Sequence, residues 1–398
     1  MLLASGLLFM TLALKQGEAQ QRPLGISFFQ DPMASQHRQL RRDEQASIPS
    51  NYLVFHISDN TQLWQALASI HRHGGKGAVV FADGDYTLDK TINIEVPAVM
   101  LLSESADPEA VIISGLGMRP TKHVDNLIRV GAAGFVLDGI TLRGVGNHLI
   151  QIAGENGADK PIIRNCILQD SYQQLVKVSY DGNRPEVFSD SGLIEYCRFE
   201  YTAGIGPNYY IGGIDAHGVR NWVIRNNVFK DIASPAEHIA EHAIHLWNNA
   251  SHNFIEGNII VDSDRGIGLG MRLGDRHPNV LFSNLAGVVK GNYIYHADNN
   301  DPFADTGIVL EDSPHVLIEE NFLYLEHNYP RSIEYRYEAT TSVMIKNNST
   351  NRPISSRNNG VATLLGNNEK LTRKEFFIKL NDQLAISSSQ IPLINTTY

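Results

Sequence analysis

The feature that most constrains the fold of this chain is a seven-residue pattern that recurs along much of its length. Each copy has two apolar residues, two polar or small residues, an Asn or Cys, and two residues that are mostly apolar. The copies are IIRNCIL (162–168), LIEYCRF (193–199), VIRNNVF (223–229), FIEGNII (254–260), VVKGNYI (288–294), LIEENFL (317–323) and MIKNNST (344–350). Their fifth positions are Cys166, Cys197, Asn227, Asn258, Asn292, Asn321 and Asn348, which lie 27 to 34 residues apart. A repeat at this spacing predicts an array of stacked units.

Each unit contains short strand-like runs that are broken by Gly, Asn and Asp, without a helical period between them. Strands this short cannot bury a core alone, but a chain that coils and stacks its coils buries one apolar column after another. Asn recurring at one position fits a turn whose side-chain amides hydrogen-bond from coil to coil. The predicted fold is therefore an all-β parallel β-helix. A β-propeller is the main alternative, but its blades need four strands and about 40–50 residues each.

Composition narrows the class of protein and of partner. The chain of 398 residues is 42% hydrophobic and carries a net charge of −10, which argues against a nucleic-acid binder, because such proteins need a basic face. Cys166 and Cys197 occupy the same repeat position in adjacent units. Parallel Cβ vectors suit a disulfide poorly, so two buried thiols are expected.

The two ends of the chain differ from the repeats. Residues 1–19 are predicted to be a signal peptide, because an apolar run is followed by small residues at Gly17 and Ala19. The expected location is therefore the periplasm or the extracellular space, with no transmembrane segment left after the signal is removed. A polar segment follows at 20–50.

The β-helix domain is expected to span 51–368, with helices at its ends. Residues 59–73 form an amphipathic pattern, with Asp59 or Asn60 as N-cap and Gly74 after the last turn. A second amphipathic helix is predicted at 370–385, within a C-terminal helix and tail at 369–398. Both helices are expected to cap the stack, since exposed end strands would pair with other chains.

Register predicts which side chains become neighbours, because adjacent coils lie about 4.8 Å apart. A second set of strands aligns as LIQIA (149–153), LVKVS (175–179), GIDAH (213–217), AIHLW (243–247), GIGLG (266–270) and GIVLE (307–311). Their second and fourth residues are apolar and are expected to face the core. The third residues should then form an outward ladder, which reads Gln151, Lys177, Asp215, His245, Gly268 and Val309.

This ladder gathers more titratable groups than any other part of the chain, and it is the predicted site. The candidate catalytic residues are Asp215, His217, His245, Lys177 and His242, and the candidate substrate-binding residues are Arg265, Arg272, Trp247, Tyr209 and Tyr210. A carboxylate between a lysine and a histidine can orient the imidazole, and cations beside an indole suit an anionic sugar. The small Gly268 and Gly270 are expected to leave room for a substrate. A merely solvated charged face is the competing interpretation.

The helix at 59–73, the following VVFADGDYTL and the stacked coils together resemble the pectin-lyase-like superfamily, which implies a right-handed β-helix. GGIDAHG (212–218) resembles the Tyr-Gly-(Phe/Ile)-Asp-Pro-His-(Asp/Glu) motif of mannuronan C5-epimerases and related alginate-acting enzymes. On that match Asp215 and His217 fall on the motif's Asp and His, and Lys177 falls where these enzymes place a catalytic lysine. The motif's Tyr is Gly212 here, its Pro is Ala216 and its last acid is Gly218.

The resemblance implies an exported enzyme that abstracts the C5 proton of uronic acid residues in an acidic polysaccharide, with a β-eliminating lyase as the first expectation. A uronan C5-epimerase and a non-catalytic glycan-binding or surface protein are the alternatives. Hydrolysis is less favoured, because it needs two carboxylates that flank one bond. No cofactor is required for this chemistry, a bound Ca²⁺ is compatible with the Asp and Asn of the loops, and a monomer is expected.

One further motif points to a different chemistry. His238, Glu241 and His242 spell H-x-x-E-H, a string found in zinc proteases. That motif needs a helix to bring both imidazoles to one metal ion. Pro235 precedes it and a predicted strand begins at Ala243, so a zinc protease is not expected.

Overall fold

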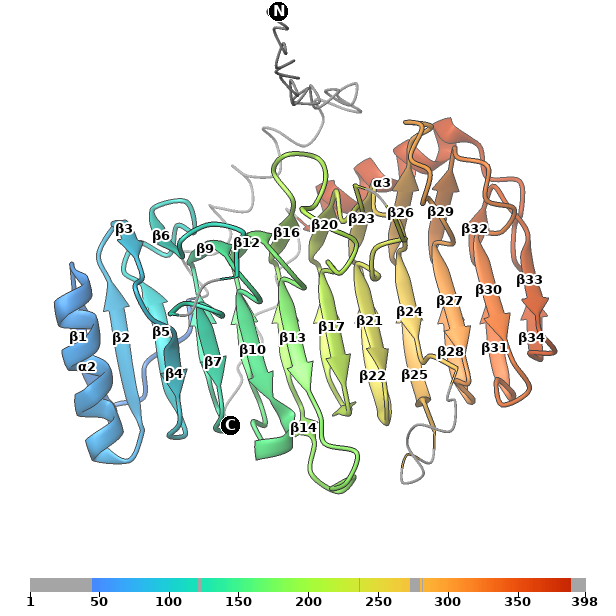
Figure 1. Ribbon diagram of the computed structural model, residues 1–398. Helices are drawn as coiled ribbons and strands as arrows, with labels where there is room; N and C mark the ends of the chain where they lie inside the picture. The colour runs from blue at the N-terminus through green and yellow to red at the C-terminus, as the bar shows by residue number, and fades with distance from the viewer. Residues whose placement is uncertain (1–44, 121–122, 236, 273–279, 281, 388–398) are drawn as a thin grey trace, which may run out of the picture.

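A computed structural model describes residues 45–120, 123–235, 237–272, 280 and 282–387. Within these ranges the chain forms coils that stack along one axis, as Figure 1 shows, and the strands of successive coils pair into three parallel sheets. The predicted parallel β-helix is confirmed. The predicted signal peptide, residues 1–19, lies outside the described residues. None of the helices in the described ranges has the length and apolar character needed to cross a membrane.

Each complete coil contributes one strand to each sheet, and the end strands β1 and β34 belong to sheet A alone. Sheet A consists of β1 (Leu53–Ile57), β2 (Gly77–Phe81), β5 (Val99–Ser103), β8 (Val136–Asp138), β11 (Ile162–Arg164), β15 (Leu193–Glu195), β19 (Val223–Arg225), β22 (Ala250–Glu256), β25 (Asn284–Lys290), β28 (Val316–Glu319), β31 (Val343–Lys346) and β34 (Ala362–Leu365), with the short β14 (Ser189–Asp190) and β18 (Val219–Arg220) at its side. Sheet B consists of β3 (Gly84–Thr87), β6 (Val111–Ser114), β9 (Thr141–Val145), β12 (Ile167–Ser171), β16 (Arg198–Glu200), β20 (Val228–Lys230), β23 (Ile259–Val261), β26 (Tyr293–His296), β29 (Phe322–Leu325) and β32 (Ser349–Thr350).

Sheet C is the sheet that carries the predicted site. It consists of β4 (Ile92–Ile94), β7 (Ile128–Val130), β10 (Ile150–Ala153), β13 (Val176–Ser179), β17 (Ile214–His217), β21 (Ile244–Trp247), β24 (Ile267–Leu269), β27 (Ile308–Glu311), β30 (Ile333–Arg336) and β33 (Ile354–Arg357). A short 3₁₀ turn, η2 (Gly154–Asn156), follows β10. The first and third residues of these strands face inward, and Val176, Ile214 and Ile244 are fully buried register partners.

The asparagines lie in the turn between sheets A and B, and they form the predicted ladder. Asn227 Nδ2 donates to Asn258 Oδ1 at 3.0 Å, and Asn258 Nδ2 donates to Asn292 Oδ1 at 3.0 Å. The ladder continues through Asn321 and Asn348. Each amide also bonds to backbone, as where Asn258 Nδ2 donates to the carbonyl of Ile224 at 2.9 Å. In the coils from Asn227 to Asn348, each turn amide therefore has a partner in the next coil.

Cys166 and Cys197 occupy the position of the ladder asparagines in the two coils before Asn227. Both Cys166 and Cys197 are buried and free, as expected. The backbone N–H of Cys197 donates to Asn227 Oδ1 at 2.8 Å, so the ladder changes from amide to thiol at this coil.

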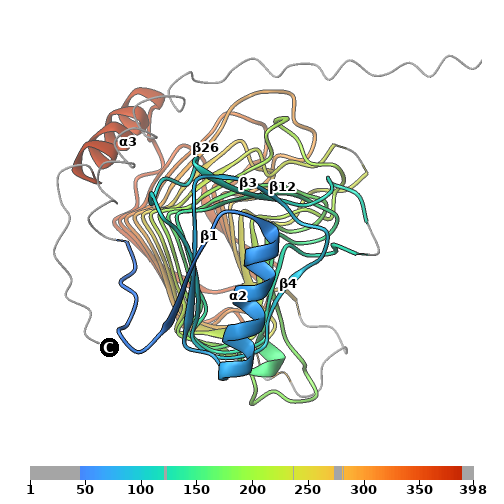
Figure 2. The same ribbon diagram turned by 90° about the vertical axis from the view of Figure 1, so that its left-hand side faces the viewer.

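The N-terminal end is capped as predicted. Helix α2 (Asn60–His73) begins after Asp59, whose Oδ1 accepts from the N–H of Gln62 at 2.8 Å, and ends at Gly74 with φ +81°. Its buried face carries Leu63, Ala66 and Ile70. Figure 2 shows α2 lying across the end of the stack, where it covers the first coil.

The C-terminal helix exists, but it does not cover the last coil. Helix α3 (Arg373–Ser387) begins three residues later than expected, because Thr372 and Glu375 form a capping box in which the Thr372 N–H donates to Glu375 Oε2 at 2.9 Å. Its Phe376 packs on the outer face of sheet B, 6.2 Å from the Tyr293 ring. Figure 2 shows α3 beside the stack, and Val361 of the last coil is 60% exposed. The expectation of a second end cap was wrong in this respect.

Candidate active site on sheet C

The predicted register of the site is confirmed. Lys177 on β13 is paired with Asp215 on β17, and Asp215 is paired with His245 on β21. His217 is paired with Trp247 at the end of the same strands. The ladder lies outside the core, but it is not solvated: Asp215 and His245 are each only 3% exposed. Neighbouring side chains cover them, so the interpretation as a solvated charged face does not fit.

Lys177, Asp215 and His217 form one group, which we call the lysine cluster. The Lys177 ammonium makes an ion pair with Asp215 Oδ2. It also lies 2.8 Å from His217 Nε2, and this nitrogen lies 3.5 Å from Asp215 Oδ1. Because the ammonium has only donors, Nε2 of His217 carries its lone pair toward Lys177.

Two further side chains hold the lysine cluster in place. The Trp247 indole N–H donates to Asp215 Oδ1 at 2.8 Å, and the side-chain amide of Asn248 lies 3.2 Å from His217 Nδ1, whose proton the amide oxygen can accept. The Trp247 ring packs at 4.2 Å against His217 and at 5.3 Å against His245. Trp247 therefore positions Asp215 and the two imidazoles, whereas the sequence suggested that it binds the substrate.

The electrostatics of the lysine cluster follow from burial and from these contacts. Burial alone would raise the pKa of the Asp215 carboxyl, but its neighbours His217 and Lys177 hold this pKa well below its usual value. Burial lowers the pKa of His217, and the charge of Asp215 only partly offsets the effect. At neutral pH the site therefore combines a carboxylate, an ammonium and a neutral imidazole.

A second group lies next to the first, and we call it the histidine cluster. It contains Glu241, His242 and His245. Glu241 Oε2 lies 3.2 Å from His245 Nδ1 and 3.7 Å from His242 Nδ1. The ring of His242 occupies the place of a side chain at residue 268, since a Cβ on Gly268 would lie 2.7 Å from His242 Nε2. The room expected at Gly268 is thus filled by the protein itself.

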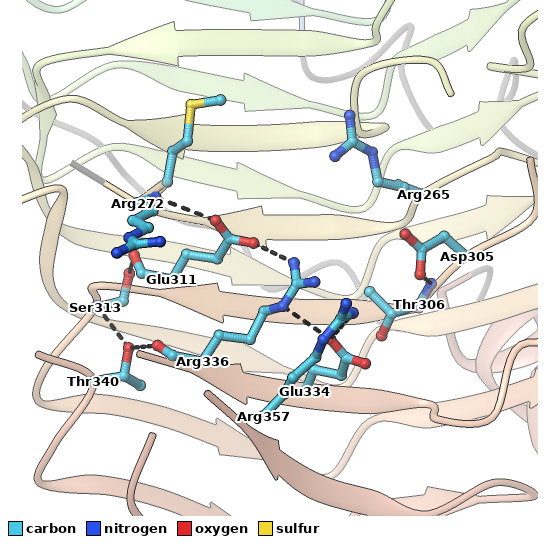
Figure 3. A network of polar contacts seen from close by, with 12 residues as sticks. Arg265, Arg272, Asp305, Thr306, Glu311, Ser313, Glu334, Arg336, Thr340 and Arg357 are labelled. Carbon is cyan, nitrogen blue, oxygen red and sulfur yellow. Dashed lines mark hydrogen bonds and ion pairs between the residues drawn. The ribbon is translucent and has the colours of Figure 1, made fainter. Parts of the chain in front are cut away.

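The two predicted arginines lie at different distances from these clusters. Arg265 donates from Nε to the carbonyl of Ala240 at 2.9 Å, and its Nη2 lies 3.6 Å from Glu241 Oε2. Arg272 lies farther along the sheet, where its N–H donates to Glu311 Oε2 at 3.2 Å. Figure 3 shows Arg272 beside Glu311 and apart from Arg265.

Beyond Gly268 the outer face of sheet C continues as a network of ion pairs. Arg336 bridges Glu311 and Glu334, and Figure 3 shows this bridge between β27 and β30. Arg331 and Arg357 also lie within ion-pair distance of Glu334. These charges are matched within the protein.

The remaining predicted residues lie apart from the clusters. Tyr209 and Tyr210 are 40% and 47% exposed, and within the described ranges no hydrogen bond or ring contact joins them to Lys177, Asp215 or His217. Tyr209 packs edge-on against His238 at 5.0 Å. His238 is exposed and the segment that follows it is not helical, so the H-x-x-E-H string does not form the zinc-protease arrangement, as expected.

Sequence reasoning missed two participants. Glu241 was noted only as part of H-x-x-E-H, although its spacing of one and four residues from His242 and His245 was available as a signal. Asn248 contacts His217 from the turn after β21, where no sequence pattern distinguished it from other turn asparagines.

Comparison with known proteins adds information about the fold. No protein-family model and no curated protein matches the chain. The A-module of a mannuronan C-5 epimerase from Azotobacter vinelandii is similar with a TM-score of 0.48 and 14% identity, over 79% of this chain and 93% of that one. An alginate lyase from Paenibacillus sp. is similar with a TM-score of 0.41 and 12% identity, over 79% of this chain and 99% of that one.

The catalytic domain of a GH87 α-1,3-glucanase is similar with a TM-score of 0.44 and 16% identity. The match covers 81% of this chain but only 59% of the glucanase chain. The three parallel sheets confirm the parallel β-helix that the resemblance implies. Identities and TM-scores this low indicate nothing about function, whereas the side chains of sheet C form a defined set of chemical groups.

Proposed function

We propose that this protein is an exported polysaccharide lyase that removes the C5 proton of uronic acid residues in an acidic polysaccharide. The observation that carries the proposal is the lysine cluster: an ammonium held between a carboxylate and a neutral imidazole on neighbouring rungs of one sheet. Each of the three groups has a distinct use in proton abstraction next to a carboxylate.

In the proposed reaction Lys177 neutralises the carboxylate of the substrate, which lowers the cost of negative charge at C5. When the substrate carboxylate binds the Lys177 ammonium, the lone pair of His217 Nε2 is released from Lys177 and accepts the C5 proton, and Asp215 stabilises the imidazolium that forms. The electron pair of the C5–H bond becomes the C4–C5 double bond. The C4–O bond breaks with its pair on the leaving oxygen, which takes a proton from water or from the imidazolium.

Elimination is favoured over epimerisation by one feature of this chain. An epimerase needs a proton donor on the opposite face of the sugar ring. Residue 212, where the epimerase motif has Tyr, is Gly. The nearby Tyr209 and Tyr210 are exposed and make no hydrogen bond or ring contact with the lysine cluster in the described structure. The leaving group needs no such donor on the second face.

The proposal is tested by incubating the protein with alginate, polymannuronate, polyguluronate, pectate and glycosaminoglycans. We expect ultraviolet absorbance from an unsaturated sugar on at least one polymer and no activity in Lys177→Ala. The matched control is Lys346→Ala, which removes another strand lysine that pairs with a carboxylate, at 3.0 Å from Glu319 on sheet A.

The other functions give different outcomes in the same assay. A changed C5 configuration by NMR without unsaturated ends identifies an epimerase, and saturated new ends identify a hydrolase. A polymer that binds and stays intact identifies a glycan-binding protein. Any of these results, or equal activity of Lys177→Ala and the wild type, contradicts the lyase.

A further inference from the structure

We propose that the histidine cluster is a binding site for a divalent transition-metal ion of the zinc type, with Glu241, His242 and His245 as its ligands. These three side chains each offer one ligand atom, and the atoms lie within 4.8 Å of one another. Two imidazoles and one carboxylate suit Zn²⁺ or Co²⁺, whereas Ca²⁺ prefers oxygen ligands alone. The site is separate from the lysine cluster, and the inference does not depend on the proposed reaction.

The first argument is the hydrogen bonding of His245. Its Nε2 lies 3.0 Å from the carbonyl of Gly270, which can only accept, so Nε2 carries the proton. The lone pair of the neutral ring is then on Nδ1, and Nδ1 faces Glu241 Oε2 at 3.2 Å. Two acceptors at this distance need a cation between them. A carbonyl bond on the far nitrogen is also how metal-binding histidines are commonly oriented.

The second argument is His242, which is 4% exposed. Neither of its ring nitrogens has a hydrogen-bond partner in the described structure, and the same is true of His245 Nδ1 and Glu241 Oε2. Buried polar atoms are nearly always paired, because an unpaired one costs about 1–3 kcal/mol. Four such atoms in one place indicate a missing ligand.

The third argument is that the backbone makes room for the cluster at two glycines. A Cβ on Gly212 would lie 3.0 Å from Glu241 Cβ, and a Cβ on Gly268 would lie 2.7 Å from His242 Nε2. A side chain at either position would displace a proposed ligand. Gly212 stands where the epimerase motif has Tyr, so the departure from that motif opens the space that Glu241 uses.

The distances from Glu241 to the two histidines fit a metal with an open position. Ligand atoms around tetrahedral zinc lie about 3.3 Å apart, given bonds of about 2.0–2.1 Å, and the contacts of 3.2 and 3.7 Å to Glu241 lie close to that value. Three protein ligands leave a fourth position for water or an anion, as in catalytic zinc sites. Arg265 Nη2, 3.6 Å from Glu241 Oε2, is a competing cation that weakens binding.

The test is titration of the full-length, chelator-treated protein with Zn²⁺ by calorimetry and with Co²⁺ by visible absorption. We expect one ion per chain and the absorption bands of a four-coordinate Co²⁺ site. His245→Ala should lose affinity by about tenfold or more. Gly268→Ala should do the same with all ligands present, because its methyl group displaces the His242 ring. Arg265→Gln should bind more tightly, since it removes the competing charge.

His217→Ala is the control, because it removes an imidazole of the same sheet that is not a proposed ligand. It should bind Zn²⁺ as the wild type does. The inference is overturned if the wild type binds no stoichiometric ion, which would leave a proton between Glu241 and His245. It is also overturned if both His245→Ala and Gly268→Ala bind as tightly as the wild type. Circular dichroism of each variant shows whether it is folded. If His245→Ala does not fold, Gly268→Ala alone decides the test.

Discussion

The turn between sheets A and B and the outer face of sheet C use the same vertical register with opposite results. In the turn, five successive coils from Asn227 to Asn348 place the same residue at the same position, and each amide satisfies the next. On sheet C, successive rungs carry Lys177, Asp215 and His245, and several buried atoms nearby have no partner in the described part of the chain. Repetition in register stabilises the fold, and variation in register builds a site.

The difference has a thermodynamic consequence. Hydrogen bonds of the asparagine ladder are complete, so removing one rung leaves buried groups unpaired. The histidine cluster already contains unpaired atoms, so it contributes less to stability than its burial suggests. Sites of this kind are where a protein departs from local optimisation.

The largest effect is expected from His217→Ala. We predict that product formation falls by about a thousandfold or more, because the proposed base is lost. The free energy of unfolding in urea should change by less than the loss of a ladder amide does. Initial rates and urea melts measure the two effects. His56→Ala, at an exposed position on β1, is the control and should change neither. Full activity in His217→Ala would remove the contrast between the two regions.

The opposite result is expected from Asn258→Ala. The change leaves the backbone N–H and Nδ2 of Asn227 without the Oδ1 acceptor, and the carbonyl of Ile224 without its donor. We predict a loss of about 3–5 kcal/mol in the free energy of unfolding, with the active fraction keeping its rate. Asn93→Ala, at an exposed position on β4, should change stability by about 0.5 kcal/mol or less. A stable Asn258→Ala would show that the ladder is dispensable.

A pH-dependent effect is expected from Asp264, which lies just before β24. Burial, with the charge of Asp301 beside it, raises the pKa of Asp264 to about 7. The folded protein therefore holds a proton that the unfolded chain releases near pH 4, so stability should fall as pH rises from about 4 to about 7. Asp301 in turn faces His296, which also lies near Asp262.

Asp264→Asn tests this expectation. Its amide oxygen can keep the bonds from the N–H groups of Ser234 and Ala240, which Asp264 Oδ2 now accepts at 3.1 and 2.8 Å. We predict that the variant loses most of the slope and is more stable than the wild type above pH 7 by about 2–4 kcal/mol. The raised pKa of His296, due to Asp301 and Asp262 and opposed by burial, adds a slope of the same sign that remains. Parallel pH profiles of the two proteins would contradict the assignment.

The smallest effect is expected from Cys197→Asn, which would lengthen the ladder by one coil. Its Nδ2 could donate to Asn227 Oδ1, which already accepts from the N–H of residue 197. We predict a gain of about 0.5–1.5 kcal/mol in the free energy of unfolding. Cys197→Ser, which is too short to reach the next amide, is the control. A loss of stability in Cys197→Asn would mean that the coil at residue 197 cannot accommodate an amide.

Much of the fold could be predicted because a stacked coil ties sequence period to spatial position. The recurring Asn and the alternating apolar residues of sheet C each predicted their own register, and both were confirmed. The position of helix α3 could not be predicted in the same way. An amphipathic pattern indicates that one face of a helix is buried, but it does not indicate which surface of the protein covers that face. Phe376 packs against aromatic rings on the outer face of sheet B, at the side of the stack.

The sequence predicted which residues of the site are neighbours, but it did not predict the contacts that their side chains make. Lys177, Asp215 and His217 could be brought together on paper because register alone makes them adjacent. That Trp247 would donate to Asp215, or that His242 would fold over Gly268, depends on side-chain rotamers and on the turn before each strand. Those turns differ in length from coil to coil, so no repeat constrains them.

The amino-acid sequence by itself determined the coil, its period and the column of residues on each sheet, because backbone hydrogen bonding between equal coils transmits register over the whole length. The tertiary structure alone decided which of these residues are buried, which nitrogen of His217 and of His245 carries a proton, and where Glu241 lies. These properties depend on packing between side chains from different coils, and packing is set only when all of the coils are in place.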